Sequence, residues 1–172
     1  FDTRIFHKEA KSLVNAGYEV TLVAQHEREE TIDGIRIIPL RKPRNRIERM
    51  TKIVWQAYKV ALTTDADIYH FHDPELIPIG LLLKCRGKKV IYDVHEDVPE
   101  QILSKEYIHK MFKGFIAAIF NFIEKLSAKS FDYIICTTDI ISSKFKKYNE
   151  KTETIKNYIS KDKLYSGDFN EF

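Results

Sequence analysis

The sequence predicts an α/β protein built on a doubly wound, mostly parallel, Rossmann-like sheet with helices on both faces. Helical and β-rich segments alternate along the 172 residues, as they do in proteins with parallel sheets. Two strand candidates, 90–92 and 133–136, are almost continuously apolar, which is typical of strands buried on both faces. With 44% hydrophobic and 31% charged residues, the composition is that of an ordinary folded domain.

Two helices and three strands are predicted in the first half. They cover residues 4–16 (helix), 18–24 and 35–40 (strands), 46–63 (helix) and 67–72 (strand). Thr3 stands where a cap begins a helix, and Gly17 where a left-handed residue ends one. The Asp33-Gly34 turn marks the start of the second strand.

Three helices and three strands are predicted in the second half. They cover 75–85 (helix), 88–94 (strand), 107–128 (helix), 132–138 (strand), 139–148 (helix) and 153–157 (strand). The long helix carries a wide apolar stripe of Ile108, Met111, Phe112, Phe115, Ile116, Ile119, Phe122, Ile123 and Leu126. We expect this stripe to be core, because most such stripes are. The alternative is that the helix, which also carries lysines, lies on a membrane.

A doubly wound domain normally opens with a strand, whereas this sequence opens in the loop that would follow one. In the usual strand order, 3-2-1-4-5-6, the first strand is central. We therefore expect a strand to be missing between strands 18–24 and 67–72, which should not pair directly.

Several classes of protein are disfavoured by the sequence. A net charge of +3 does not indicate a nucleic-acid partner. Cys85 and Cys136 lie far apart and favour a reduced, cytoplasmic protein. No apolar run approaches the roughly 18 residues that span a bilayer, and neither a phosphate-binding glycine loop nor a nucleophile elbow is present.

Four predicted loops, one before the first helix and three at strand ends, place polar residues at the edge where the carboxyl ends of parallel strands meet. They are Asp2, Thr3 and Arg4, then His72 and Asp73, then His95, Glu96 and Asp97, and finally Thr137, Thr138 and Asp139. Ligands of open α/β sheets bind at this edge. Among these residues, Thr3, Asp73, Thr138 and Asp139 also have a simpler interpretation as helix caps.

His70 and His72 alternate to one face of their strand. His70, in mid-strand, is expected to be a core residue with a buried hydrogen-bond partner, whereas His72, at the strand end, is the candidate catalytic residue. A metal-dependent hydrolase that uses His70, His72, Asp73 and His95 is an alternative. The barrel that usually displays such a His-x-His pair needs about 250 residues, which disfavours it.

The one dense basic cluster contains Arg41, Lys42, Arg44 and Arg46. Most such clusters are solvated loops. The functional interpretation is contact with anionic lipid headgroups or with an acidic acceptor, which would make the protein peripheral at the inner face of the cell membrane.

The order and spacing of five segments resemble the N-terminal half of glycosyltransferases of the two-domain GT-B type, in the large retaining group called family 4. The segments are Phe1-Asp2-Thr3-Arg4-Ile5, Gly17 to Val20, Asp33-Gly34-Ile35, Asp67 to Asp73 and Tyr92 to Glu96. The resemblance implies that residues 1–158 are the acceptor-side domain. Residues 159–172 would then be a linker towards a C-terminal donor-binding domain that this sequence lacks.

The resemblance also implies an activity. Such an enzyme moves a hexose from a nucleotide-sugar to a glycan or lipid-linked acceptor, with retention, in polysaccharide or cell-envelope glycan synthesis, without a metal or resident cofactor. In the family's pattern Asp2, Thr3 and Arg4 would face the donor phosphates and His72 would approach the transferred sugar. Asp73, His95, Glu96 and Thr138 are the remaining substrate-binding candidates. The chain alone is expected to be inactive, and a non-catalytic ligand-binding domain is the other alternative.

Overall fold

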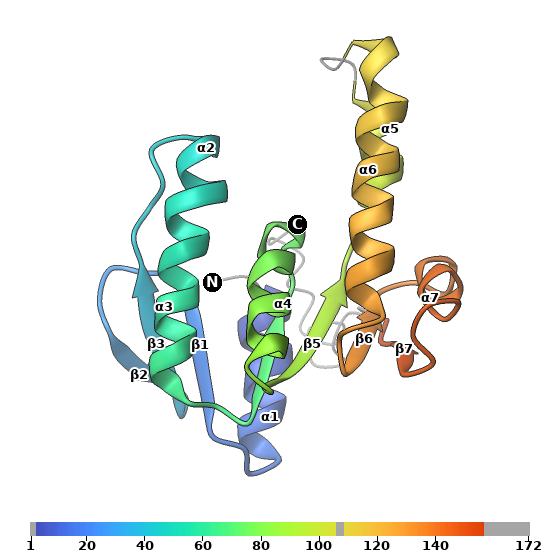
Figure 1. Cartoon of the computed structure of the whole chain (residues 1–172). Coiled ribbons are helices and arrows are strands. Elements are labelled where there is room, and N and C mark those ends of the chain that lie inside the picture. The colour runs from blue at the N-terminus through green and yellow to red at the C-terminus, as the bar shows by residue number, and fades with distance from the viewer. Residues whose placement is uncertain (1–2, 106–108, 157–172) are drawn as a thin grey trace, which may run out of the picture.

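Seven strands form two sheets in the computed structural model, which describes residues 3–105 and 109–156 (Figure 1). The first sheet has the order β1 (Val20–Gln25), β3 (Ile35–Leu40), β2 (Glu30–Ile32), and the second has the order β4 (Ile68–Phe71), β5 (Lys89–Val94), β6 (Tyr133–Cys136), β7 (Thr152–Thr154). All neighbours are parallel except β2 and β3. The predicted α/β class and mostly parallel sheet are confirmed.

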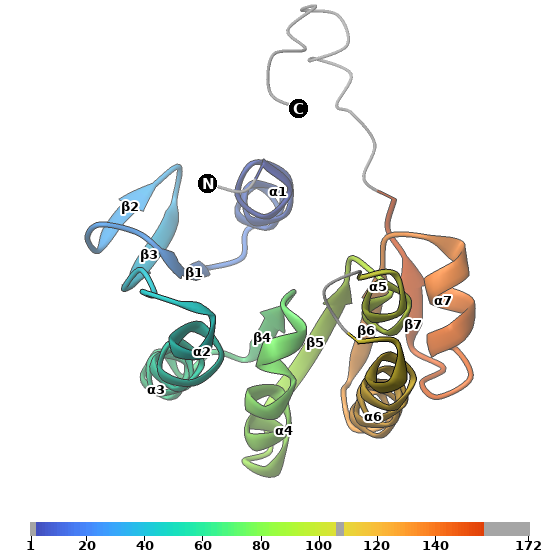
Figure 2. The same cartoon turned by 90° about the horizontal axis from the view of Figure 1, so that it is seen from above.

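Helices cover both faces of these strands. They are η1 (Thr3–Ala10) and α1 (Lys11–Asn15), α2 (Arg46–Glu48), η2 (Arg49–Ile53) and α3 (Val54–Thr64), η3 (Pro74–Leu76) and α4 (Ile77–Cys85), α5 (Val98–Ser104), α6 (Lys110–Ala128), and α7 (Asp139–Phe145). Seen from above, α1 lies on one side of the strands and α3, α4 and α6 lie on the other (Figure 2). Asp2 and the predicted linker, 159–172, lie outside the described residues.

Strands β1 and β4 each end a sheet and do not pair with each other within the described residues. This outcome agrees with the prediction that strands 18–24 and 67–72 do not pair directly. Because no backbone hydrogen bonds join the two sheets there, side chains and helices must hold them together.

The N-terminal helix makes one of these connections. Phe6 and Ala10 pack in a buried cluster with Ile35 and Ile37 of β3, while Arg4 reaches β5 in the other sheet. The predicted α-helix over 4–16 is π-helical up to Ala10, and its wider turn brings Arg4 next to the residue five positions later, Glu9.

Two elements were not predicted. β2 pairs antiparallel with β3 across a hairpin in which Asp33 and Gly34 have φ of 51° and 79°, the left-handed values that a tight hairpin turn requires. A three-residue, mostly polar strand has too short a pattern to detect. The other element, α5, begins where the Asp97 side chain accepts a hydrogen bond from the Glu100 backbone N–H.

The expectation that the apolar stripe of the long helix is core is wrong. Eight of its residues are exposed, and they are called the α6 stripe below: Met111, Phe112, Phe115, Ile116, Ile119, Phe122, Ile123 and Leu126. The face that α6 buries instead includes Ala117, Glu124, Ser127 and Ala128. Nineteen helical residues span about 28 Å, whereas the six-residue β5 spans about 20 Å, so α6 extends well beyond the sheet (Figure 1).

Gly80 of α4 tests the packing of the second sheet. A Cβ atom built on Gly80 would lie 2.7 Å from Phe71 Cε1 and 2.9 Å from Phe131 Cε1, and both rings are buried. We expect Gly80→Ala to lower the free energy of unfolding by about 1–3 kcal/mol, as overpacking of a core does.

Gly114 of α6 is the matched control, because nothing lies within 4 Å of its built Cβ. Gly114→Ala should raise stability by roughly 0.5–1 kcal/mol through helix propensity. Urea denaturation of both variants measures the difference, and equal effects on the two variants would show that the packing around α4 is wrong.

Candidate active site

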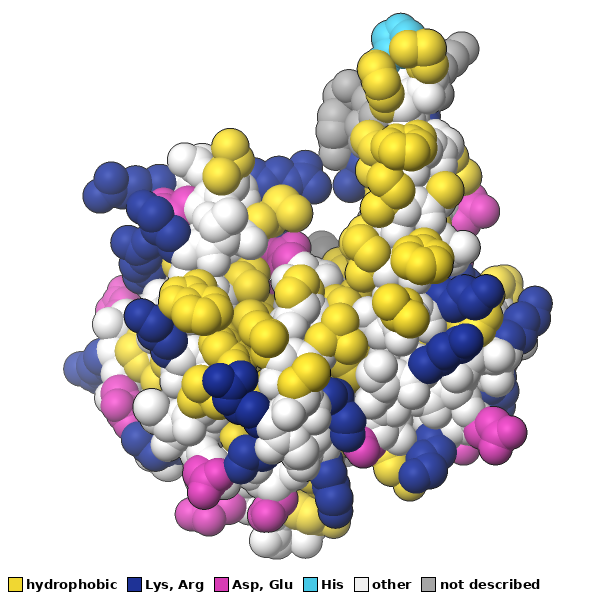
Figure 3. All heavy atoms as spheres, viewed as in Figure 1, with side chains coloured by type: hydrophobic (Ala, Val, Ile, Leu, Met, Phe, Trp, Pro, Cys, Tyr) yellow, Lys and Arg dark blue, Asp and Glu magenta, His cyan; other side chains and the backbone are white. Residues whose placement is uncertain are grey.

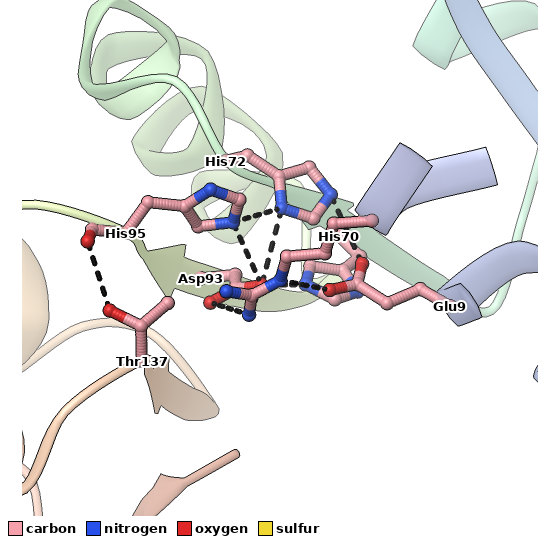
Figure 4. Close-up of polar contacts among 7 residues, drawn as sticks. Glu9, His70, His72, Asp93, His95 and Thr137 are labelled. Carbon is pink, nitrogen blue, oxygen red and sulfur yellow. Dashed lines mark hydrogen bonds and ion pairs between the residues drawn. The ribbon is translucent and has the colours of Figure 1, made fainter. Parts of the chain in front are cut away.

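Polar side chains from several elements meet at the carboxyl ends of β4 and β5, around the carboxylate of Asp93 (Figure 4). His72 follows β4 and His95 follows β5, and these two strands are parallel neighbours. The predicted meeting of strand-end residues at one edge is confirmed for these two histidines.

Asp93 is completely buried and accepts hydrogen bonds from three side chains. Its Oδ2 lies 2.8 Å from Nη2 of Arg4 and 3.2 Å from Nε2 of His95, and Nδ1 of His72 lies 3.3 Å away. Burial disfavours the charged carboxylate, but the two imidazoles and the guanidinium outweigh it and lower the pKa of Asp93. The carboxylate is therefore ionised near neutral pH.

Both ring nitrogens of His72 face acidic side chains. Nδ1 faces Asp93 and is 3.1 Å from Nε2 of His95, while Nε2 is 3.5 Å from Oε2 of Glu9. The second distance is longer than a hydrogen bond. Burial, although opposed by His72 and Arg4, raises the pKa of Glu9. These contacts fix the plane of the His72 ring.

His70 lies on the same face of β4, with its ring centroid 4.7 Å from that of His72. The expectation that it has a buried hydrogen-bond partner is wrong for the described residues: Nε2 is buried without one, and Oδ2 of Asp93 is 3.9 Å away. Burial and the charge of His72 lower the pKa of His70 to about 4. His70 is therefore neutral at neutral pH.

A pocket of about 740 Å³ opens beside this cluster. His72, Asp73, His95 and Glu96 line it, as does Arg46 of the basic cluster. On one side the wall comes from the α2–η2 segment and on the other from α5 and the residues around it. Further lining residues are Ile5, Pro43, Asn45, Arg49, Met50, Pro74, Glu75, Tyr92, Val98, Gln101 and Lys105.

Other predicted site residues do not line the pocket. Arg4 is buried and holds Asp93 and Glu9. Thr138 caps α7 by accepting from the Ile141 backbone N–H, as its simpler interpretation predicted. Thr3 is the first residue of η1, and its side chain is not among those that the structure describes.

Most of the basic cluster lies outside the pocket. The Arg41 guanidinium and the Arg44 backbone N–H both donate to the carboxylate of Glu48, while Lys42 is exposed. Only Arg46 lines the pocket.

Arg49, Asp93 and Glu9 are among the residues of the site that were not predicted. Arg49 pairs with Glu75 and lies 3.6 Å from Asp73 across the pocket wall. Asp93 had a detectable signal, since it is an acidic residue inside an apolar strand. Glu9 had none, because only the fold brings it to His72.

Of the four residues that the metal-site hypothesis named, the structure brings His72 and His95 together as possible ligands, but not Asp73. Asp73 is paired with Arg49, and the possible ligands that gather within 4.8 Å are Glu9, His72, Asp93 and His95. The Arg4 guanidinium already binds both oxygens of Asp93. A positive charge at that distance opposes a divalent cation, so the contacts favour a hydrogen-bonded cluster.

Comparisons with known proteins agree with the fold. A family model described as Glycosyltransferase Family 4 matches residues 3–163. A structure of sucrose-phosphate synthase from Thermosynechococcus elongatus has a TM-score of 0.63 at 13% identity, over 90% of this chain and 42% of that one. A second structure of that enzyme has a TM-score of 0.60 at 14% identity, over 92% and 87%. No curated protein sequence matches.

The low pKa of His70 gives a testable dependence of stability on pH. In the unfolded chain His70 gains a proton near pH 6.5, and in the folded chain only near pH 4. The unfolded state therefore binds more protons between these values, so the free energy of unfolding falls as the pH falls from 6.5 to 4. The loss attributable to His70 is on the order of 2–3 kcal/mol.

The His70→Leu variant should lack this part of the loss, which urea denaturation at pH 7, 5.5 and 4.5 measures against the unsubstituted protein. Burial raises the pKa of Glu124 to about 7 despite Lys144, so Glu124 stabilises the folded state as the pH falls. This opposite contribution is the same in both proteins. Parallel pH profiles for the two proteins would contradict the account of His70.

Proposed function

Because the chain belongs to glycosyltransferase family 4, we propose that it works in the transfer of a sugar from a nucleotide-sugar to a glycan or lipid-linked acceptor, with retention of configuration. The chain spans 42% of the first sucrose-phosphate synthase structure, so this activity is proposed for the whole protein. We assign the acceptor side to the described domain and the donor mainly to another domain. Polysaccharide or cell-envelope glycan synthesis is the proposed setting.

The observation that carries the proposal is the position of His72 on the pocket wall. Its Nδ1 is held by Asp93, which orients the ring as a carboxylate commonly orients an imidazole. Its Nε2 is 3.5 Å from Glu9, too far for a good hydrogen bond, and can therefore contact a sugar hydroxyl. In this role His72 positions or polarises the sugar and is not a nucleophile.

The other lining residues fit a substrate with hydroxyl and phosphate groups. Asp73, Glu75 and Glu96 offer carboxylates, and carboxylates accept hydrogen bonds from hydroxyls. Arg46, Arg49 and Lys105 place positive charge along the same pocket, where it would attract a phosphate. Neither role requires a metal or a resident cofactor.

Substitution of His72 tests the proposal in the full-length protein. His72→Ala should lower kcat/KM for sugar transfer by about 100-fold, the size of effect that misplacing a substrate has. His70→Ala is the matched control and should lower it far less, because Nε2 of His70 is buried. Melting temperatures of both variants separate catalysis from folding. An unchanged rate for folded His72→Ala would remove His72 from the site.

A further inference from the structure

The outer face of α6 has the composition of a surface that binds something apolar. The α6 stripe runs from Met111 to Leu126, and three of its side chains are 65–72% exposed: Met111, Phe115 and Phe122. Soluble monomers rarely expose contiguous apolar patches larger than a few hundred Å². Figure 3 shows the hydrophobic side chains running along α6 and continuing over α3 and α4 on the same face.

The exposed charge on the described part of this helix is positive. Among the described side chains of α6, Lys125 is the exposed charged residue. The acidic residue of the helix, Glu124, is buried against Lys144. Lys129 is exposed immediately after the helix. The exposed charge that the described part of α6 and the residue after it carry is therefore positive, and positive charge beside an apolar stripe complements an anionic surface.

Exposed apolar side chains with basic neighbours also lie on α3 and α4, on the same face as the α6 stripe (Figure 3). Trp55 and Leu62 of α3 and Leu82 of α4 are exposed, and Lys and Arg side chains lie beside the apolar groups (Figure 3). Tryptophan is enriched where proteins meet the headgroup region of a bilayer. No helix in the described part of the chain is long and apolar enough to cross a membrane.

We propose that the α6 stripe docks on an anionic lipid bilayer, with α6 lying in the plane of the interface. Aromatic and aliphatic side chains would enter the boundary between headgroups and acyl chains, and Lys125 and Lys129 would meet lipid phosphates. A second copy of the chain is a poorer complement, because the described part of its α6 would offer lysine and no exposed acidic side chain.

The docking also bears on the substrate, and this step rests on the proposed function. The pocket lies between the α2–η2 segment and α5, and α5 packs against α6. A bilayer on α6 would therefore be close to the pocket, and a lipid-linked acceptor could reach it without leaving the membrane. Docking itself can be measured without a donor or an acceptor, so its failure is distinguishable from failure of the proposed transfer.

Flotation with vesicles tests the docking in the full chain. We expect the protein to bind vesicles of phosphatidylcholine that contain about 30% phosphatidylglycerol, which gives them a negative surface potential. Binding to vesicles of phosphatidylcholine alone should be at least tenfold weaker. Phe115→Ser with Phe122→Ser should weaken binding to the anionic vesicles at least tenfold. Lys125→Gln with Lys129→Gln should weaken binding to the anionic vesicles and leave the weaker binding to phosphatidylcholine vesicles unchanged.

Ile140→Ser is the matched control, because Ile140 is 84% exposed on α7, away from the α6 stripe. It should leave vesicle binding unchanged, and circular dichroism should show that all variants are folded. The proposal is overturned if the unsubstituted protein does not float with anionic vesicles, or if the phenylalanine pair and Ile140→Ser behave alike. A dimer that the phenylalanine substitutions dissociate, without vesicle binding, would show that a second copy covers the face.

Discussion

The buried ion pair between Arg4 and Asp93 is the interaction on which the arrangement of the two sheets and of the site depends. A carboxylate inside a sheet is strongly disfavoured unless it is paired and hydrogen-bonded, and Asp93 on β5 is fully buried. Arg4 extends from η1, whose Phe6 packs on the first sheet. Since β1 and β4 do not pair, this contact between η1 and β5 replaces backbone hydrogen bonds as a link across the two sheets.

The same carboxylate organises the proposed active site. Asp93 orients His72 and His95 from below the pocket, and Arg4 supplies the charge that lets the carboxylate stay ionised at that depth. His70 shares the strand face but remains neutral, because partial burial and the charge of His72 lower the pKa of its ring. The two histidines of this strand face therefore differ: His70 is a neutral, partly buried residue, whereas His72 lines the pocket.

Much of the fold could be predicted from the sequence, because long apolar strands and helical periodicity are local signals. The edge that holds His72 and His95 followed from the rule for parallel sheets. The partners of Asp93 did not, since Arg4 is 89 positions away in sequence and only packing brings them together. The α6 stripe misled for a related reason: periodicity shows that a helix has an apolar face, but not that the sheet is long enough to cover it.

A double-mutant cycle on Arg4 and Asp93, followed by urea denaturation, tests the central role of their ion pair most directly. Arg4→Met and Asp93→Asn should each lower the free energy of unfolding by about 3–5 kcal/mol, because each leaves a buried partner uncompensated. The double variant should lose clearly less than the sum of the two. Losses that add to within about 0.5 kcal/mol would show that the two residues act independently and would contradict the account.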